Sequence, residues 1–178
     1  MKITWIRFSV YLGLIVVFGG VMTIAQQPAP LAVAPVPPQL LNAKTVFISN
    51  AGADSGLFPH PFTGDPDRAY NEFHAGVVSW GRYELVATPA EADLVFEIQL
   101  TAPSGPSNAD KSKGASDPLP MLRLVIYDRP THYALWALTE SIAPATLQKT
   151  HDHNFDEAVA NLVLDAGRLT KSLPNGMH

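Results

Sequence analysis

An alternation of apolar and polar residues constrains the fold of this 178-residue chain more than any other feature. In residues 94–101 every second side chain is large and apolar, namely Leu94, Phe96, Ile98 and Leu100. Because successive side chains of a strand point to opposite faces of a sheet, the pattern predicts a strand with one face on a core. Residues 121–128 and 133–142 repeat the pattern, so three consecutive strands with a common apolar face are expected.

A strand, a helix and a second strand are predicted before this group. Residues 44–50 (KTVFISN) and 83–87 (YELVA) have the composition of short strands. The helix between them is expected to begin with Asp65 as its cap and Pro66 at its first position, and to end at Gly81. Its apolar residues recur at helical spacing: Tyr70, Phe73, Val77 and Trp80. This order implies a crossover between two parallel strands.

A second amphipathic helix is predicted at the C-terminal end, beginning at Asn154 as a capping residue with Glu157 at the third helical position. Its apolar stripe comprises Phe155, Val159, Leu162, Ala166, Leu169 and Leu173. Two helices with one stripe each can both be buried by one face of a sheet. The predicted fold is therefore an α+β two-layer sandwich with a mixed five-stranded sheet and two helices on one face.

The first residues have the features of an export signal. Lys2 and Arg7 precede an apolar run over residues 8–22, and small residues follow up to Ala25. Cleavage after Ala25 is predicted, which would make the protein periplasmic or secreted. The alternative is an uncleaved membrane anchor, because residues 8–25 are nearly long enough to span a bilayer. Residues 26–39 then form a Pro/Ala-rich linker, residues 40–173 the globular domain and residues 174–178 a disordered tail.

Charge and cysteine content exclude several functions. The formal net charge is −4, and removing residues 1–25 takes away Lys2 and Arg7, which leaves ten basic and sixteen acidic side chains. Such an acidic surface disfavours nucleic acid as a partner. The chain has no cysteine, so disulfides, thiolate metal sites and a lipid-modified cysteine are excluded. No motif for a cofactor is present, and none is expected.

The polar face of the three-stranded group is the first candidate site. Its proposed partner-binding residues are Glu97, Gln99, Arg123, Val125 and Tyr127. Glu97 and Arg123 are expected to face each other across the hairpin, and Val125 and Tyr127 to act as apolar anchors. The alternative is that this face is only the hydrated side of an antiparallel region.

Histidines form the second candidate site. In residues 150–156 (THDHNFD), His151 and His153 lie two apart, and in an extended segment both rings would project to one side, as metal coordination requires. The candidate third ligand is His60, with Asp54, Asp65 or Asp67 as alternatives. The alternative is that the segment is a solvated polar loop before the capped helix.

The chain resembles a known group of envelope proteins in residues 43–173. The strand ADLVFEI (92–98) and the paired strands of LRLVIYDRPTHYALWAL (122–138) are similar to those of the N-terminal domain of the translocation protein TolB and of lipoprotein domains of the curli-secretion type. The resemblance implies a non-enzymatic envelope adaptor or binding module with envelope proteins as partners. The alternative function is a metal-binding protein or metal-dependent hydrolase that uses His151 and His153.

Overall fold

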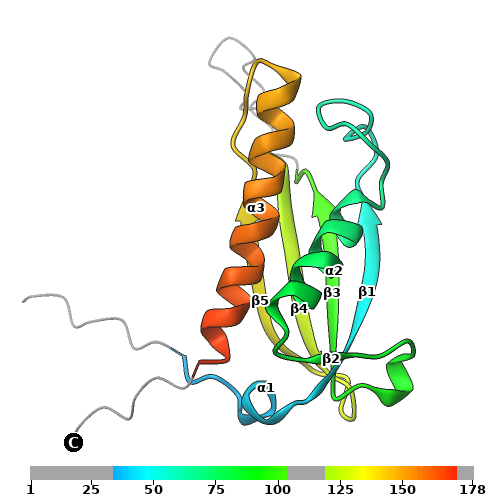
Figure 1. Ribbon diagram of the computed structural model, residues 1–178, viewed down its shortest axis with the longest axis vertical. Helices are drawn as coiled ribbons and strands as arrows, with labels where there is room; N and C mark the ends of the chain where they lie inside the picture. The colour runs from blue at the N-terminus through cyan, green and yellow to red at the C-terminus, as the bar shows by residue number, and fades with distance from the viewer. Residues whose placement is uncertain (1–33, 104–118, 172–178) are drawn as a thin grey trace, which may run out of the picture. The chain divides into compact units, whose positions relative to one another are not determined.

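An open five-stranded sheet carries helices on one face in the computed structural model, which describes residues 34–103 and 119–171 (Figure 1). The predicted α+β two-layer fold is confirmed. The elements are α1 (Pro38–Asn42), β1 (Thr45–Ala53), α2 (Arg68–Trp80), β2 (Glu84–Leu85), a 3-10 turn (Pro89–Glu91), β3 (Leu94–Thr101), β4 (Met121–Asp128), β5 (Ala134–Ser141) and α3 (Gln148–Leu169). The predicted signal segment, most of the linker and the tail at 174–178 lie outside the described residues.

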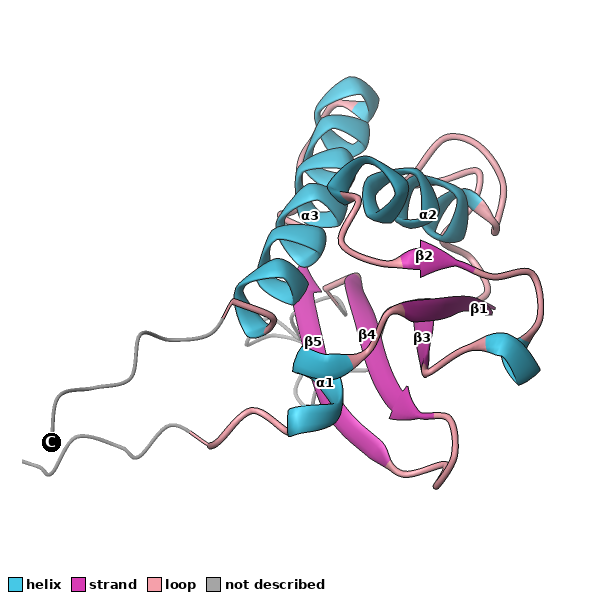
Figure 2. Ribbon diagram, turned by 60° about the horizontal axis from the view of Figure 1, so that its bottom comes forward, coloured by secondary structure: helices cyan, strands magenta, loops and turns pink. Residues whose placement is uncertain are grey.

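The strand order is β2-β1-β3-β4-β5, and the predicted meander forms three of these five strands. β1 is parallel to both β2 and β3, whereas β3, β4 and β5 are successively antiparallel. The parallel strands are connected through α2, as the crossover rule predicts. Figure 2 shows α2 and α3 together over one face of the sheet.

The alternating pattern places the core between this face and the two helices. Leu94, Phe96, Ile98 and Leu100 of β3 are all buried, as are Leu122, Leu124 and Ile126 of β4. Phe73 and Val77 of α2 and Phe155 and Leu162 of α3 cover them from the helical layer. Burial of each such side chain stabilises the folded state by about 1.5–3 kcal/mol. The apolar stripes of the two helices and the apolar faces of the strands therefore contribute to one shared core.

The ends of α2 follow the predicted signals with a small shift. The Asp65 carboxylate accepts the N–H of Asp67 at 2.9 Å, and its carbonyl accepts the N–H of Arg68 at 3.1 Å. Asp65 therefore caps the turn that leads into α2, although the helix begins at Arg68 rather than at Pro66. Gly81 ends it in the left-handed conformation, with φ of 66°, which favours glycine.

Helix α3 corrects the sequence prediction, because it begins at Gln148 and not at Asn154. The first turns are held by the loop before α2: Gln148 donates to the carbonyl of Pro61, and the Asp152 carboxylate accepts the N–H of Thr63 at 2.9 Å. The Asn154 side chain donates to the carbonyl of Ala143 at 2.9 Å instead of capping. Tertiary contacts of polar residues thus extend the helix beyond its local start signal.

The short helix α1 fixes the point where the chain joins the domain. Leu40 is fully buried, and its carbonyl accepts the hydroxyl of Tyr83 at 3.0 Å. Arg82 donates to the carbonyl of Leu41 at 2.8 Å. These bonds anchor α1 beside the segment that follows α2.

Neither 34–103 nor 119–171 contains a helix with the length and apolar character needed to cross a membrane.

Candidate binding groove

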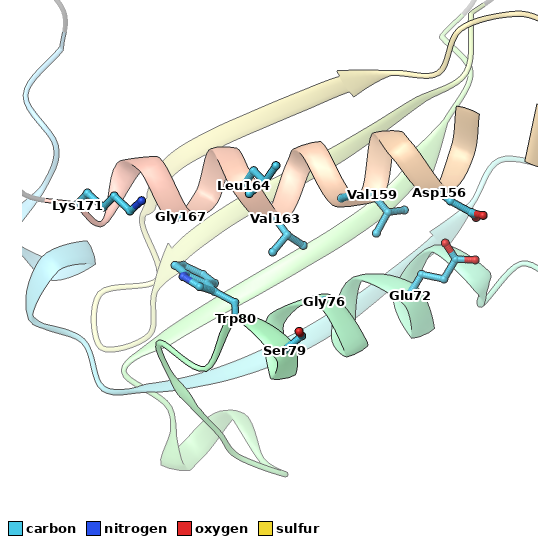
Figure 3. Close-up of a pocket in the computed structure, with 11 residues that line it drawn as sticks. Glu72, Gly76, Ser79, Trp80, Asp156, Val159, Val163, Leu164, Gly167 and Lys171 are labelled. Atoms are coloured by element: carbon cyan, nitrogen blue, oxygen red, sulfur yellow. The ribbon is translucent and has the colours of Figure 1, made fainter. Parts of the chain in front are cut away.

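A groove of about 570 Å³ runs between α2 and α3 (Figure 3). Helix α2 contributes Glu72, Gly76, Ser79 and Trp80, and α3 with the residues after it contributes Asp156, Val159, Ala160, Val163, Leu164, Gly167 and Lys171. Most of these side chains are apolar. Glu72 and Asp156 lie at one end of the groove, and Lys171 lies at the other.

Two glycines lie along this groove, and at Gly76 the absence of a side chain lets the helices approach closely. A Cβ added to Gly76 would lie 2.9 Å from Cγ2 of Val163, closer than real side chains come. The indole of Trp80 packs over Gly167, where an added Cβ would lie 3.6 Å from the ring. Leu164 beside them is 59% exposed. The groove is therefore narrow and apolar, and part of its wall is in contact with water.

A charge cluster closes the acidic end and ties the two helices together. The guanidinium of Arg68, at the start of α2, lies 2.7 Å from the Glu72 carboxylate. It also lies 2.6 Å from the carboxylates of both Asp152 and Asp156 on α3. Its Cζ stands 4.5 Å above the centre of the Phe155 ring. One cation thus faces three carboxylates, which leaves this end of the groove negative.

The cluster shifts the pKa values of its carboxyl groups in opposite directions. Desolvation acts to raise the pKa of Asp152, but the N–H of Thr63 and the guanidinium of Arg68 outweigh it and lower this pKa to about 2. Desolvation raises the pKa of Glu72, and the neighbouring Asp156 adds to this, against the effect of Arg68. Asp152 is therefore the carboxylate that Arg68 stabilises most clearly.

The outer sheet face carries the predicted partner-binding residues, but they differ in exposure. Val125 is only 3% exposed, although it points away from the helices. It lies opposite Glu97 on β3 and Ala137 on β5. Tyr127 donates its hydroxyl to the Glu97 carboxylate at 3.2 Å, and partial burial together with that carboxylate raises the pKa of Tyr127. Binding of a partner at this face stays a prediction.

The expected Glu97–Arg123 pair across the hairpin is wrong. In the observed register Arg123 lies opposite Gln99, and Glu97 lies opposite Val125. The long loop between β3 and β4 left the register undefined in the sequence, and a shift of two residues keeps every side chain on its face. The Glu97 carboxylate is bonded by the hydroxyl of Tyr127 and not by Arg123, as had been expected.

The histidine segment is helical, so the extended geometry expected for His151 and His153 is wrong. Residues two apart on a helix point about 200° apart around its axis. His151 packs edge-on against Phe62, and His153 lies 3.3 Å from the Glu157 carboxylate. His60 lies 3.2 Å from the side chain of Gln148. Among residues 34–103 and 119–171, no three His, Cys, Asp or Glu side chains form a group that could hold a metal ion.

A second cavity, of about 680 Å³, lies at the carboxyl ends of β1 and β3. Its lining includes Asp54, Ser55 and His151. The Asp54 carboxylate accepts the hydroxyl of Thr101 at 2.7 Å and the N–H of Ala102 at 2.8 Å. These bonds, the N–H of Ala102 first, lower the pKa of Asp54. The Asp54 carboxylate therefore binds backbone and side-chain donors at the end of β3. Because this carboxylate is already hydrogen-bonded within the protein, the groove between the helices is the better candidate for a ligand site.

The groove could have been found from the sequence by a second apolar stripe on the last helix. Ala160, Val163, Leu164 and Gly167 recur at helical spacing beside the stripe that faces the sheet. A helix with two adjacent apolar stripes has more apolar surface than its contact with the sheet can bury. The remaining apolar surface indicates a further contact.

Comparison with known proteins gives fold likeness only. Neither a family model nor a curated protein matches the chain. A dodecameric PelC from Paraburkholderia phytofirmans is 12% identical, with 74% of this chain and 89% of that chain covered and a TM-score of 0.36. A DUF330 protein from Xanthomonas campestris is 13% identical, with 71% and 84% covered and a TM-score of 0.41. TolB from Acinetobacter baumannii is 16% identical, with 68% and 28% covered and a TM-score of 0.33.

The structural matches include TolB, whose N-terminal domain is one of the proteins that the sequence resembles. The fold and the groove define a small α+β domain whose two helices leave an apolar channel between them. All three TM-scores are below 0.5, so the function proposed below rests on this chain's own residues.

Proposed function

We propose that this protein is an exported, non-enzymatic binding domain that holds an apolar polypeptide segment in the groove between α2 and α3. The observation that carries the proposal is the exposed apolar wall of the groove, with Leu164 59% exposed next to Val163 and Trp80. An elongated apolar surface in contact with water is characteristic of a binding site. Export is inferred from the N-terminal residues 1–25.

The shape of the groove favours a polypeptide. From Asp156 to Gly167 it follows α3 for eleven residue steps, or about 16 Å at the helical rise of about 1.5 Å per residue, and Lys171 lies just beyond the helix. The close contact of Gly76 and Val163 leaves room only for small or narrow side chains. Apolar segments in grooves of this kind bind as helices or in the polyproline conformation.

The chemistry of the lining residues favours binding over catalysis. Within 34–103 and 119–171, the lining residues include one hydroxyl group, that of Ser79, and no histidine. A serine nucleophile needs a base within hydrogen-bonding distance. The carboxylates of Glu72 and Asp156 are engaged with Arg68. These groups therefore orient a ligand by charge at one end of an apolar channel.

Photo-crosslinking in the cell envelope tests this function. A photo-reactive amino acid replaces Leu164 in the groove, and the control places it at Thr139 on the outer sheet face. We expect a defined protein adduct from position 164 that is absent from position 139. A second substitution, Ala160→Glu, adds a charge to the groove at an exposed position and should remove the adduct. Equal adducts from both positions, or an adduct that survives Ala160→Glu, would refute the proposal.

A further inference from the structure

One end of the groove carries an excess of exposed negative charge. The side chains of Asp156 and Glu157 on α3 are 57% and 63% exposed. Glu72 of α2 adds a third carboxylate. The cation at this end, Arg68, is only 15% exposed, and its guanidinium already faces three carboxylates. A positive group that approaches from outside would therefore be attracted to this end.

The other end of the groove carries a positive charge. Lys171 is exposed and lines the groove just beyond the last turn of α3 (Figure 3). Arg168 lies one turn before it, but it pairs with Asp165 on the same helix, and neither of these two residues lines the groove. The charge that the groove presents at this end is therefore that of Lys171.

The α3 surface between the two charged ends is apolar and has small residues. Leu164 is 59% exposed and lies midway in the sequence between Asp156 and Lys171. Ala160, one turn before Leu164, is also exposed. Gly167, about one turn after it, has no side chain to hold another helix away. A helix with such a surface can be covered by a second helix at short distance.

A second copy of the chain complements this surface in one orientation. A two-fold axis brings the same surface of both copies together, so an acidic end meets a basic end when the two α3 helices run antiparallel. With the axis beside Leu164, Lys171 of each copy lies opposite Asp156 of the other. Ala160 of each copy then lies opposite Gly167 of the other, and the small residues let the helices approach. A parallel arrangement would bring like charges together.

We propose that the apolar segment held in the groove is helix α3 of a second copy of this chain, and that the two copies pair about a two-fold axis at Leu164. This inference rests on the proposed binding function and names the partner. The apolar side chains supply the contact. The two symmetry-related pairs of Lys171 with Asp156 set the antiparallel direction, because exposed charges contribute more to specificity than to affinity.

Sedimentation velocity of the protein purified after export, over the micromolar range, tests the pairing. We expect a dimer that dissociates on dilution. Lys171→Glu and Asp156→Lys each place like charges together at both contacts, and each should raise the dissociation constant at least about tenfold. Arg123→Glu makes the same change of charge as Lys171→Glu on the outer sheet face and should leave it within about twofold. A monomer at every concentration, or an equal effect of Arg123→Glu, would overturn the inference.

A mixture of the two groove variants separates the contact from a general loss of folding. In a mixed dimer of Lys171→Glu with Asp156→Lys, the introduced carboxylate faces the introduced ammonium at one contact. At the other contact the natural Lys171 faces the natural Asp156. Both contacts are then attractive, so mixing should restore the dimer that each variant alone has lost. A mixture that associates no better than the separate variants would refute the proposed orientation.

The photo-crosslink from position 164 separates this inference from the proposed function. An adduct with twice the mass of the chain supports both. An adduct with a different protein, together with a monomeric sedimentation profile, would refute the second copy as the occupant and leave the proposed function standing. A monomeric profile without any adduct would refute both.

Discussion

Replacement of Arg68 by methionine should destabilise the domain strongly, because one side chain joins both helices to the loop before α2. The Arg68 side chain is 15% exposed and bonds to Glu72, Asp152 and Asp156. Methionine keeps the apolar stem near Phe155 but removes the charge. The carboxylates of Glu72 and Asp152, which are largely shielded from water, then lose their partner. The Asp156 carboxylate is exposed enough to be solvated.

The expected loss is about 3–6 kcal/mol in the free energy of unfolding. Hydrogen bonds to charged groups contribute about 1.5–3 kcal/mol each, and the exposed Asp156 pair adds less than about 1 kcal/mol. Urea denaturation at pH 7 measures the change. Arg168→Met is the matched control: Arg168 is 76% exposed, pairs with Asp165 on the same helix and should cost less than about 1 kcal/mol. A loss for Arg68→Met no larger than for Arg168→Met would refute the reasoning.

Acid should remove the same stabilisation in the unmodified protein. The pKa of Asp152 falls from an ordinary value of 3.8 to about 2 in the folded state, because it accepts hydrogen bonds from Thr63 and Arg68 despite desolvation. A lowered pKa contributes stability that is complete above pH 4 and is lost as the pH falls toward 2. The shift corresponds to about 2 kcal/mol. Urea denaturation between pH 5 and pH 2 should therefore show a smaller acid loss for Arg68→Met than for the unmodified protein.

Three further substitutions test local parts of the structure by urea denaturation. Gly76→Ala should cost about 1–3 kcal/mol because its Cβ would collide with Val163, and Val163→Ala in the same chain should recover part of that loss; additive losses would exclude the contact. Gly81→Ala should cost about 1–2 kcal/mol because φ is 66°, and an unchanged stability would contradict that conformation. Asp93→Ala should cost about 1–3 kcal/mol because its carboxylate accepts the N–H groups of Lys44 and Thr45, whereas Glu91→Ala should be nearly neutral.

The sequence predicted most of the fold because local patterns and tertiary contacts agree there. Alternation in β3 and β4, the apolar stripe of α2 and the glycine at its end each specify an element and the face that it buries. The parallel orientation of β1 and β2 follows from chain connectivity alone. These predictions needed no knowledge of which side chains meet across the core.

The errors lie where long-range contacts decide the outcome. Helix α3 begins six residues earlier than predicted, since the loop before α2 engages Gln148 and Asp152. That shift also places His151 and His153 on a helix, so the geometry assumed for a metal site is absent. The second apolar stripe of α3, which signals the groove, was overlooked, and how closely α2 approaches α3 is not specified by a single-sequence pattern.

The position at which a partner binds tests the central claim most directly. Once a partner is captured at Leu164, its crosslinked segment can be added as a peptide to the labelled domain, and the amide chemical shifts can be followed. The account predicts that the largest changes map to Gly76, Ser79 and Val163 in the groove. Largest changes at Gln99, Arg123 and Tyr127 would contradict it and place binding on the outer sheet face.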